Sequence, residues 1–219
     1  MRIVGGRLRG RRLEAPGGTA LRPTADRTRE ALFNILCQGK LDWRPDRKPA
    51  GAAPGSNPLA GARVLDAFAG TGALGLEALS RGAAFVTFME NQAAALAACR
   101  NNIALLAETA RAQALRCDVL RPPPAPAPCD LVLMDPPYNQ GLAAPALAAL
   151  EAAGWLAPGA LGVIELMAAE PFALPEGFEA LDERKYGKAR LVFLRAPECE
   201  GLISRAVGIT RSDGACRWG

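Results

Sequence analysis

The chain has 219 residues and a mass of 22.9 kDa, with 50% hydrophobic and 22% charged residues and a net charge of +4. A chain of this length can bury the core of one domain without a disulfide framework or a structural metal. It contains no histidine, which excludes Ser-His-Asp and Cys-His catalysis, imidazole bases and every zinc site that uses histidine.

Positive charge is concentrated towards the N-terminus. Residues 1–48 contain 12 Lys/Arg and 5 Asp/Glu, a net charge of +7, whereas the rest of the chain carries −3. A basic arm favours a polyanionic partner such as nucleic acid, although a merely solvated arm is the alternative. A helix is predicted from about Thr24, a suitable N-cap, to Leu36. Residues 44–58 hold four prolines and two glycines and are predicted to be a linker.

Strands and helices alternate through the remainder of the chain. Apolar runs predict strands at residues 63–68, 85–90, 115–118, 131–135 and 161–166. Helical patterns lie between them at residues 73–81, 92–106 and 143–153. This alternation predicts an α/β fold with a Rossmann-like, mostly parallel sheet. Two further strands flank the turn-like Tyr186-Gly187-Lys188 and predict a C-terminal antiparallel hairpin.

The chain thus divides into four predicted segments. They are a basic N-terminal arm and helix at 1–43, the linker at 44–58, the α/β domain at 59–196 and a loose tail at 197–219. No run reaches the ~18 apolar residues of a membrane helix. The six cysteines include no C-x-x-C pair, which is typical of reduced thiols in a cytoplasmic protein. A monomer is expected, since no interface pattern is visible.

A glycine-rich turn follows the first predicted strand. Gly70, Gly72 and Gly75 spell G-x-G-x-x-G, and Glu90 closes the next strand, as in the dinucleotide-binding fingerprint. A turn that needs glycine only for its backbone is the alternative. Asp66 immediately precedes the turn and would repel a pyrophosphate, so a cationic ligand is favoured. S-adenosylmethionine has a sulfonium, an ammonium and a ribose, but no phosphate.

Two further acids support this ligand. Glu90 can accept hydrogen bonds from both ribose hydroxyls, and Asp118, at the end of the third strand, from the adenine amine. With Asp66, they place three acids at the carboxyl ends of successive strands, where open α/β sheets bind ligands. The sequence therefore predicts S-adenosylmethionine as the cofactor.

Asp135-Pro136-Pro137-Tyr138 follows the fourth strand. Two prolines fix the backbone and remove two N–H donors, which leaves carbonyl groups turned outward. A carboxylate and a proline carbonyl can together hold both hydrogens of an NH2 group, and the tyrosine ring can stack on a planar base. This arrangement suits methyl transfer to an exocyclic amine by proximity and orientation. A proline-stiffened turn without function is the alternative.

These motifs resemble a known group of enzymes. Residues 66–75 with 135–138 look like those of class I, S-adenosylmethionine-dependent amine-N methyltransferases. Residues 1–13 (MRIVGGRLRGRRL) and 22–34 (RPTADRTREALFN) resemble the two N-terminal signatures of the RsmD family, the small-subunit rRNA guanine-N2 methyltransferases. The resemblance extends to about Leu194 and excludes the linker at 44–58 and the tail from Pro197. It implies methylation of N2 of one guanine, conventionally position 966 of 16S rRNA, in the small ribosomal subunit, with no metal and no membrane.

The resemblance also implies roles for particular residues. Those expected to hold or stack the target base are Asp135, Pro136, Pro137 and Tyr138. Those expected to form the cofactor site are Asp66, Ala67, Phe68, Gly70, Gly72, Glu90, Asn91, Asp118 and Val119. The candidate RNA contacts are Arg7, Arg9, Arg11, Arg12, Arg27 and Arg29.

Four other functions are considered. A DNA adenine-N6 methyltransferase could use the same Asp-Pro-Pro-Tyr turn, but no segment is long enough for a recognition domain. A protein-glutamine methyltransferase normally has Asn in place of Asp135. An NAD-dependent oxidoreductase would explain the glycines and Glu90 and leave Asp66 without a role. A non-catalytic RNA-binding module would explain the arm alone.

Overall fold

The computed structural model describes residues 1–14, 23–37, 41, 43 and 57–198. Residues 44–56 of the predicted linker and 199–219 of the predicted tail lie outside the described residues, as do the side chains of residues 23–26. The predicted N-cap role of Thr24 is wrong, because the helix already begins at Pro23 and Thr24 lies within its first turn. The division of the chain into four segments is retained as a prediction.

Seven strands form one sheet in the order β3-β2-β1-β4-β5-β7-β6. The first four pairings along this order are parallel, and β5–β7 and β7–β6 are antiparallel. The strands are β1 (Arg63–Ala67), β2 (Phe85–Glu90), β3 (Ala112–Arg116), β4 (Cys129–Met134), β5 (Leu156–Met167), β6 (Glu179–Tyr186) and β7 (Ala189–Arg195). The mostly parallel sheet with a C-terminal antiparallel hairpin is thus confirmed.

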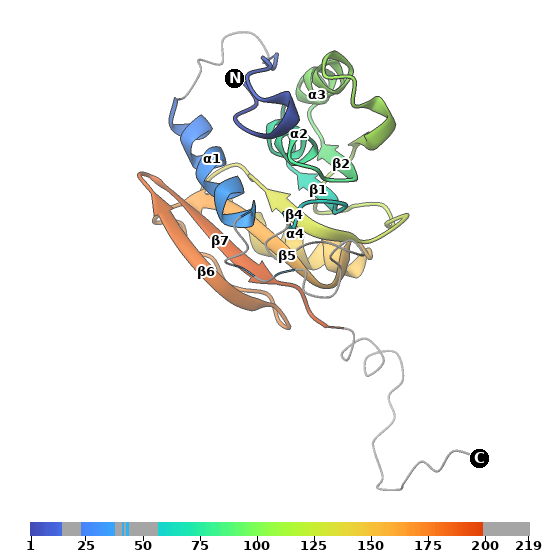
Figure 1. The fold of residues 1–219 in the computed structure, drawn as a ribbon. Helices are drawn as coiled ribbons and strands as arrows, with labels where there is room; N and C mark the ends of the chain where they lie inside the picture. Colours follow the sequence, from blue (N-terminus) through green and yellow to red (C-terminus); the bar gives the residue numbers. More distant parts are fainter. Residues whose placement is uncertain (15–22, 38–40, 42, 44–56, 199–219) are drawn as a thin grey trace, which may run out of the picture.

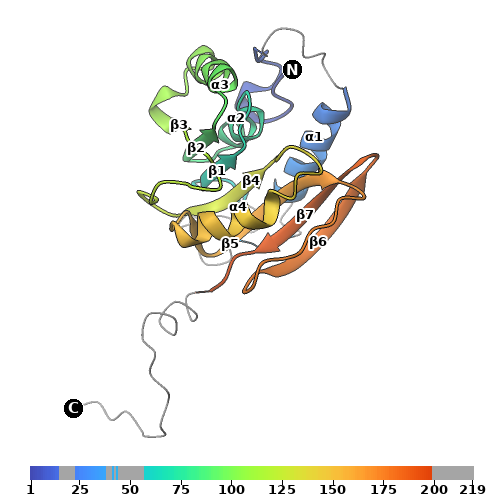
Figure 2. The same cartoon turned by 180° about the vertical axis from the view of Figure 1, so that it is seen from behind.

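Helices cover both faces of this sheet (Figures 1 and 2). One face packs against α1 (Pro23–Cys37), α2 (Ala73–Ser80) and α3 (Ala93–Leu105), and the other against α4 (Ala143–Ala152). Successive strand residues alternate between the two cores, since Val64 belongs to the first cluster and Leu65 to the second. This alternation is the two-residue period of a β-strand buried on both faces.

The described part of the basic arm packs closely on the domain. Residues 1–14 contain the short 3-10 helix η1 (Gly6–Leu8) and pair with themselves through an Arg2–Arg12 bridge. Ile3, Leu8 and Leu13 are buried in the same cluster as α1, α2 and α3. A second 3-10 helix, η2 (Thr109–Arg111), precedes β3. The sequence predicted an extension tethered to the body, whereas three apolar side chains of this segment are part of its core.

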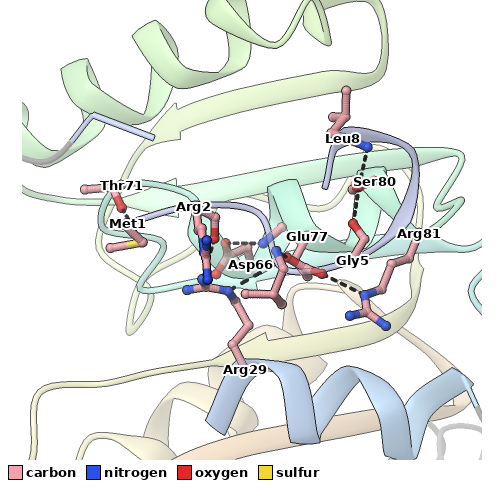
Figure 3. Close-up of polar contacts among 12 residues, drawn as sticks. Met1, Arg2, Gly5, Leu8, Arg29, Asp66, Thr71, Glu77, Ser80 and Arg81 are labelled. Carbon is pink, nitrogen blue, oxygen red and sulfur yellow. Dashed lines mark hydrogen bonds and ion pairs between the residues drawn. The ribbon is translucent and has the colours of Figure 1, made fainter. Parts of the chain in front are cut away.

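Polar side chains of α2 hold the arm in place (Figure 3). Val4 N–H donates to Glu77 Oε2 at 2.8 Å, and Leu8 N–H donates to Ser80 Oγ at 2.9 Å. The carboxylate of Glu77 is completely buried and also accepts a 2.7 Å hydrogen bond from Arg81 Nε. Because a buried charge needs partners, Glu77 fixes the arm against the helix that follows the glycine turn.

Two strand boundaries differ from the predicted ones, and the first of them lies at the site. β3 ends at Arg116, so Asp118 lies two residues beyond the strand, in the loop that follows it. β5 begins at Leu156, five residues before the predicted start, and its pairing with β4 shifts register between Cys129 and Leu131. A sequence pattern does not show such an irregularity, because the register is set by the neighbouring strand.

Candidate active site

A pocket of about 690 Å³ opens at the carboxyl ends of the parallel strands. This is the edge of an open α/β sheet at which ligands bind. The pocket is lined by Phe68, Gly70, Glu90, Asn91, Gln92, Asp118, Leu120, Asp135, Pro136, Pro137, Tyr138, Gln140 and Leu142. It therefore brings together the glycine turn, the ends of β2 and β3 and the Asp-Pro-Pro-Tyr turn, which are separate in sequence.

The glycine turn needs its small residues for different reasons. Gly70 has a φ of +54°, and a Cβ placed there would meet no described atom within 4 Å, so its backbone faces open space in the pocket. At Gly75 a Cβ would collide with the rings and methyls of Phe88 and Val86 on β2. Phe68 itself has a φ of +62°. This backbone conformation is uncommon for residues other than glycine and is found preferentially at functional sites.

Asp66 does not face the pocket. Its side chain is 1% exposed and accepts a 2.8 Å hydrogen bond from Gly75 N–H, beneath the glycine turn. Burial raises the pKa of Asp66 well above its usual value, and the hydrogen bond from Gly75 opposes this shift. The predicted contact between this carboxylate and the cation of the cofactor thus gives way to an observed role in fixing the turn at the start of α2.

Glu90 and Asp118 do line the pocket. The carboxylate of Glu90 accepts backbone hydrogen bonds from Gly70 N–H at 2.9 Å and from Gln92 N–H at 2.7 Å. These bonds fix its orientation, and each carboxylate oxygen keeps a further lone pair for a ligand hydroxyl. Asp118 is exposed and accepts from Leu120 N–H at 3.0 Å. Both acids are therefore held in place before any ligand arrives.

Asp135 lies at the opposite side of the site, directly after β4. The residue is exposed to the open pocket. Desolvation by the surrounding protein and, to a lesser extent, the charge of the neighbouring Glu165 carboxylate raise the pKa of Asp135 to about 7. The hydroxyl group of Tyr138 donates a 2.8 Å hydrogen bond to Glu165 Oε1. The two ends of the Asp-Pro-Pro-Tyr turn thus converge on Glu165.

All four predicted base-holding residues line the pocket. Of the nine predicted cofactor residues, five line it and four do not, namely Asp66, Ala67, Gly72 and Val119. Ala67 and Val119 are packed in the core with α4, and Gly72 faces Cys99 and Phe88 of the opposite core. These four positions therefore lie in the packed layers around the pocket and not in its lining.

The sequence analysis missed five residues at or next to the pocket. Those in the lining are Gln92, Leu120, Gln140 and Leu142. The fifth, Glu165, lies on β5 beside Asp135 and Tyr138. A signal for it was available, since a charged residue interrupts the otherwise apolar run of residues 161–167 at the carboxyl end of a buried strand.

The candidate RNA-binding arginines fall into two groups. Arg9, Arg12 and Arg27 have exposed side chains. Arg7 and Arg11 are exposed too, but Arg7 pairs with Glu108 and Arg11 donates a 2.9 Å hydrogen bond to Leu105 O. A guanidinium that is held by one carboxylate can still contact a phosphate.

Arg29 does not fit the role of a surface RNA contact. Its side chain is 5% exposed, and its guanidinium donates to Arg2 O at 2.7 Å and lies 3.9 Å from Glu77 Oε2 (Figure 3). Arg29 follows the exposed Arg27 by two residues on α1, so it lies on nearly the opposite side of the helix, where it meets the arm and α2. Arg29 therefore holds the structure together instead of facing solvent.

The groups in this pocket fit a particular kind of ligand. The acids Glu90, Asp118 and Asp135 converge on it, together with backbone exposed at Gly70 and an aromatic ring from Tyr138. Acids accept hydrogen bonds from hydroxyl and amino groups and disfavour phosphates, so the pocket suits a nucleoside with a cationic substituent. Within the described ranges, no three Cys, Asp or Glu side chains are placed to share a metal ion, and no helix is long and apolar enough to cross a membrane.

The sheet order and the site at its carboxyl edge define the α/β fold of class I methyltransferases. The solved structure of the yhhF protein from Escherichia coli matches with a TM-score of 0.70 and 33% sequence identity, over 90% of this chain and 98% of that chain. The predicted fold class is therefore confirmed.

Family membership follows from the sequence comparisons. The family model described as conserved hypothetical protein 95 matches residues 1–195, and the chain belongs to this family, the RsmD family. A curated relative, "Ribosomal RNA small subunit methyltransferase D" of Escherichia coli (strain K12), is 38% identical over 166 residues, 75% of this chain and 74% of that protein. The protein of the same name from Haemophilus influenzae is 34% identical over 193 residues, 85% of this chain and 89% of that protein.

Proposed function

We propose that this protein transfers the methyl group of S-adenosylmethionine to the exocyclic N2 amine of one guanine in 16S rRNA, at the position conventionally numbered 966, and acts as a monomer. The observation that carries this proposal is the single pocket that joins Glu90 and Asp118 to the Asp135–Tyr138 turn. Two of its relatives, from Escherichia coli and Haemophilus influenzae, bear the name of an rRNA small subunit methyltransferase, which supports rRNA as the substrate.

The residues of the pocket divide into a cofactor half and a base half. In the cofactor half, Glu90 would accept hydrogen bonds from the ribose hydroxyls, and Asp118 would accept one from the adenine amine. The backbone at Gly70 leaves room for the amino-acid part of the cofactor. S-adenosylmethionine supplies an electrophilic methyl group on a sulfonium. Asp66 acts indirectly, since it holds the turn through Gly75. The proposed cofactor contacts are thus those that reach the pocket.

In the base half, Asp135 and the Pro136 carbonyl would each accept one hydrogen from the guanine amine. This directs the nitrogen lone pair at the methyl carbon, so that the N–C bond forms as the S–C bond breaks and its electron pair stays on sulfur. The nitrogen then loses one proton, and Asp135, with a pKa of about 7, is basic enough to accept it near neutral pH. The target base must leave its stack to reach this site, and Tyr138 offers a ring to receive it.

The RNA would lie against the arm. Arg9 and Arg12 are exposed on the described part of the arm, and Arg27 is exposed on α1. Cationic side chains of this kind bind phosphates and position the substrate without reading its sequence. Glu77 and Ser80 fix the arm to α2, so its phosphate contacts would be placed at a constant distance from the pocket.

Methyl transfer assays test the proposal directly. Labelled S-adenosylmethionine is incubated with unmodified small subunits, naked 16S rRNA and duplex DNA, and the products are digested and identified by nucleoside mass spectrometry. We expect N2-methylguanosine in ribosomal RNA, and the ratio between subunits and naked RNA identifies the preferred form. Label on DNA adenine, or on none of the three substrates, would contradict the proposed substrate.

The cofactor half can be tested without turnover. Glu90→Ala should weaken the binding of S-adenosylmethionine by about 10- to 100-fold in calorimetry, since a hydrogen bond to a charged group contributes ~1.5–3 kcal/mol. Asp130→Asn is unsuitable as a control, because Asp130 Oδ2 accepts from Arg63 N–H. Glu151→Ala on α4 lies outside the pocket lining and is the better control. Equal affinity in the Glu90 variant and the wild type would remove this residue from the cofactor site.

A further inference from the structure

We propose that Glu165 is a positioning residue for the target base: it fixes the ring of Tyr138 at the pocket and sets the charge beside Asp135. This inference rests on the proposed function and adds a residue that the motifs do not contain. Glu165 lies on β5, outside both the glycine turn and the Asp-Pro-Pro-Tyr turn.

The sheet register brings Glu165 next to Asp135. Met134 on β4 pairs with Ile164 on β5 in a parallel ladder, and Asp135 and Glu165 are the next residues of each chain segment. Neighbouring residues in register on adjacent strands project to the same face of a sheet. Two carboxylates therefore lie side by side at the carboxyl edge, and the charge of Glu165 raises the pKa of Asp135.

The ring of Tyr138 depends on Glu165 for its orientation. The side chain is 36% exposed and lines the pocket, on a turn whose next residue, Asn139, has a φ of +58°. Its hydroxyl group donates to Glu165 Oε1 at 2.8 Å. An exposed ring on a loop can rotate about two side-chain torsions, and a hydrogen bond to a charged acceptor on a central strand restricts both. A ring held in one orientation can receive a base without first being ordered.

A buried arginine keeps Glu165 ready to accept this bond. Burial raises the pKa of Glu165, while the Tyr138 hydroxyl and the charge of Arg29 lower it. Arg29 in turn donates to Arg2 O at 2.7 Å in the arm. A hydrogen bond thus joins Arg29 to Arg2, the charge of Arg29 acts on Glu165, and a second hydrogen bond joins Glu165 to the ring of Tyr138 at the pocket.

Several charged groups act on this pair of carboxylates. Asp135 is faced by Glu165 from β5 and by Asp66 from β1, and Glu90 of β2 acts on Asp66 in turn. Glu165 is faced by Arg29 from α1 and by the Tyr138 hydroxyl. Removal of the Glu165 charge alone leaves Asp135 with one carboxylate fewer beside it, so the pKa of Asp135 should fall.

A double-mutant cycle separates this role from simple structural support. Methyl transfer is measured with Tyr138→Phe, Glu165→Ala and the double variant, with kcat and KM for RNA determined at saturating S-adenosylmethionine. We expect each single variant to lower kcat/KM for RNA by about 10-fold, in line with the loss of a charge-assisted hydrogen bond. The double variant should lose no more kcat/KM than the less active of the two single variants, because both changes remove the same contact.

Glu165→Gln supplies a readout that a purely structural role would not move. It keeps an oxygen for the Tyr138 hydroxyl and removes the charge, so the acid limb of the pH dependence of kcat/KM should shift to lower pH. Glu183→Gln and Tyr186→Phe, both on β6, are matched controls. S-adenosylmethionine affinity, measured by calorimetry, should be unchanged in all variants and reports that each is folded.

The outcomes distinguish this inference from the proposed function. If the wild-type protein makes no N2-methylguanosine, the proposed function fails whatever the variants do. If the wild-type protein is active but the losses of the two single changes multiply, or the acid limb in Glu165→Gln stays in place, the positioning role of Glu165 is overturned and the proposed function stands.

Discussion

The carboxylate of Asp66 accepts a 2.8 Å hydrogen bond from the backbone N–H of Gly75, so the end of β1 is tied to the first turn of α2. The bond spans the whole glycine turn and is buried. An acid at this position therefore shapes the loop that the cofactor would contact. The turn is fixed from beneath by Asp66 and from the side by Glu90, which accepts from Gly70 N–H.

Two glycines of the turn should respond differently to the same change. Gly75→Ala places a Cβ against Phe88 and 2.7 Å from Val86 Cγ1, which should destabilise the fold by about 1–3 kcal/mol. At Gly70, which has a φ of +54°, the added Cβ would lie in open space in the pocket. We therefore expect Gly70→Ala to lose less stability and more S-adenosylmethionine affinity than Gly75→Ala. Urea denaturation and calorimetry measure the two effects. If one variant lost more of both stability and S-adenosylmethionine affinity than the other, the separate roles of Gly70 and Gly75 would be contradicted.

Asp135→Ala should abolish methyl transfer and leave the affinity for S-adenosylmethionine nearly unchanged. Asp135 lies in the base half of the pocket, and its removal leaves the amine with one acceptor fewer and no proton acceptor. Single-turnover assays and calorimetry on the same preparation check both parts. Loss of cofactor binding together with activity would show that Asp135 acts in the cofactor half instead.

The raised pKa of Asp135 predicts the pH dependence of activity. Only the ionised carboxylate can accept both the hydrogen bond and the proton of the amine, so kcat/KM should rise as the pH passes about 7. A profile that is flat across this range would mean that Asp135 is already ionised at lower pH, or that it does not take part. Product analysis at each pH confirms that the same nucleoside is made.

The same pKa has a consequence for stability. Because the pKa of Asp135 is higher in the folded protein than its ordinary value of 3.8, the folded state holds the proton more tightly, and stability falls as the pH rises towards about 7. Asp135→Asn removes this ionisation. The variant should therefore melt at a higher temperature than the wild type at pH ~8, and the difference should disappear near pH ~4. Thermal denaturation followed by circular dichroism at both values checks the sign.

The arm depends on a buried glutamate. Glu77 is fully buried and holds Val4 N–H, Arg81 and Arg29. Glu77→Ala leaves the two arginines and the Val4 N–H without their shared acceptor and should lower the free energy of unfolding by about 3–5 kcal/mol. Glu179→Ala, which removes an exposed ion pair with Arg195, should cost less than about 1 kcal/mol. Equal losses in urea denaturation would contradict the anchoring role of Glu77.

Arg9 and Arg12 should contribute to RNA affinity mainly through their charge. Unlike the guanidinium groups of Arg7 and Arg11, theirs are not engaged by described residues. Arg9→Gln with Arg12→Gln should reduce the slope of log affinity against log salt by up to about 1.5. Arg184→Gln on β6, at the far edge of the sheet from β3, is the control. An unchanged slope in filter-binding measurements would place the arm outside the RNA interface.

Much of the fold was predictable from local pattern. The glycine turn, the alternation of strands and helices and the hairpin around Gly187 lie where the apolar periodicity and turn residues placed them. The predicted strand 85–90 agrees with β2 at both ends. Boundaries at β3 and β5 differed, because the length of a strand depends on the partner with which it pairs.

The candidate site was predictable where a continuous motif, or an acid at the end of a predicted strand, indicated it. Asp135, Pro136, Pro137 and Tyr138 all line the pocket, and so does Glu90. Asp66 and Arg29 differ, because both were expected to reach a ligand and are buried against backbone instead. The spacing of residues fixes which side of an element they occupy, but the neighbouring elements decide whether that side meets solvent or protein.

The order of the elements, the family and the chemical groups available for the reaction can be predicted from the sequence, because periodicity, turn residues and motifs act over short stretches of chain. Which of these groups meet depends on the packing of the folded chain. Glu165 joins Tyr138 and Asp135 only because β5 pairs with β4 in one register, and Arg29 reaches Arg2 only because α1 and the arm pack together on the same face of the sheet. Contacts between residues far apart in sequence depend on packing between whole elements, and short-range patterns do not encode them.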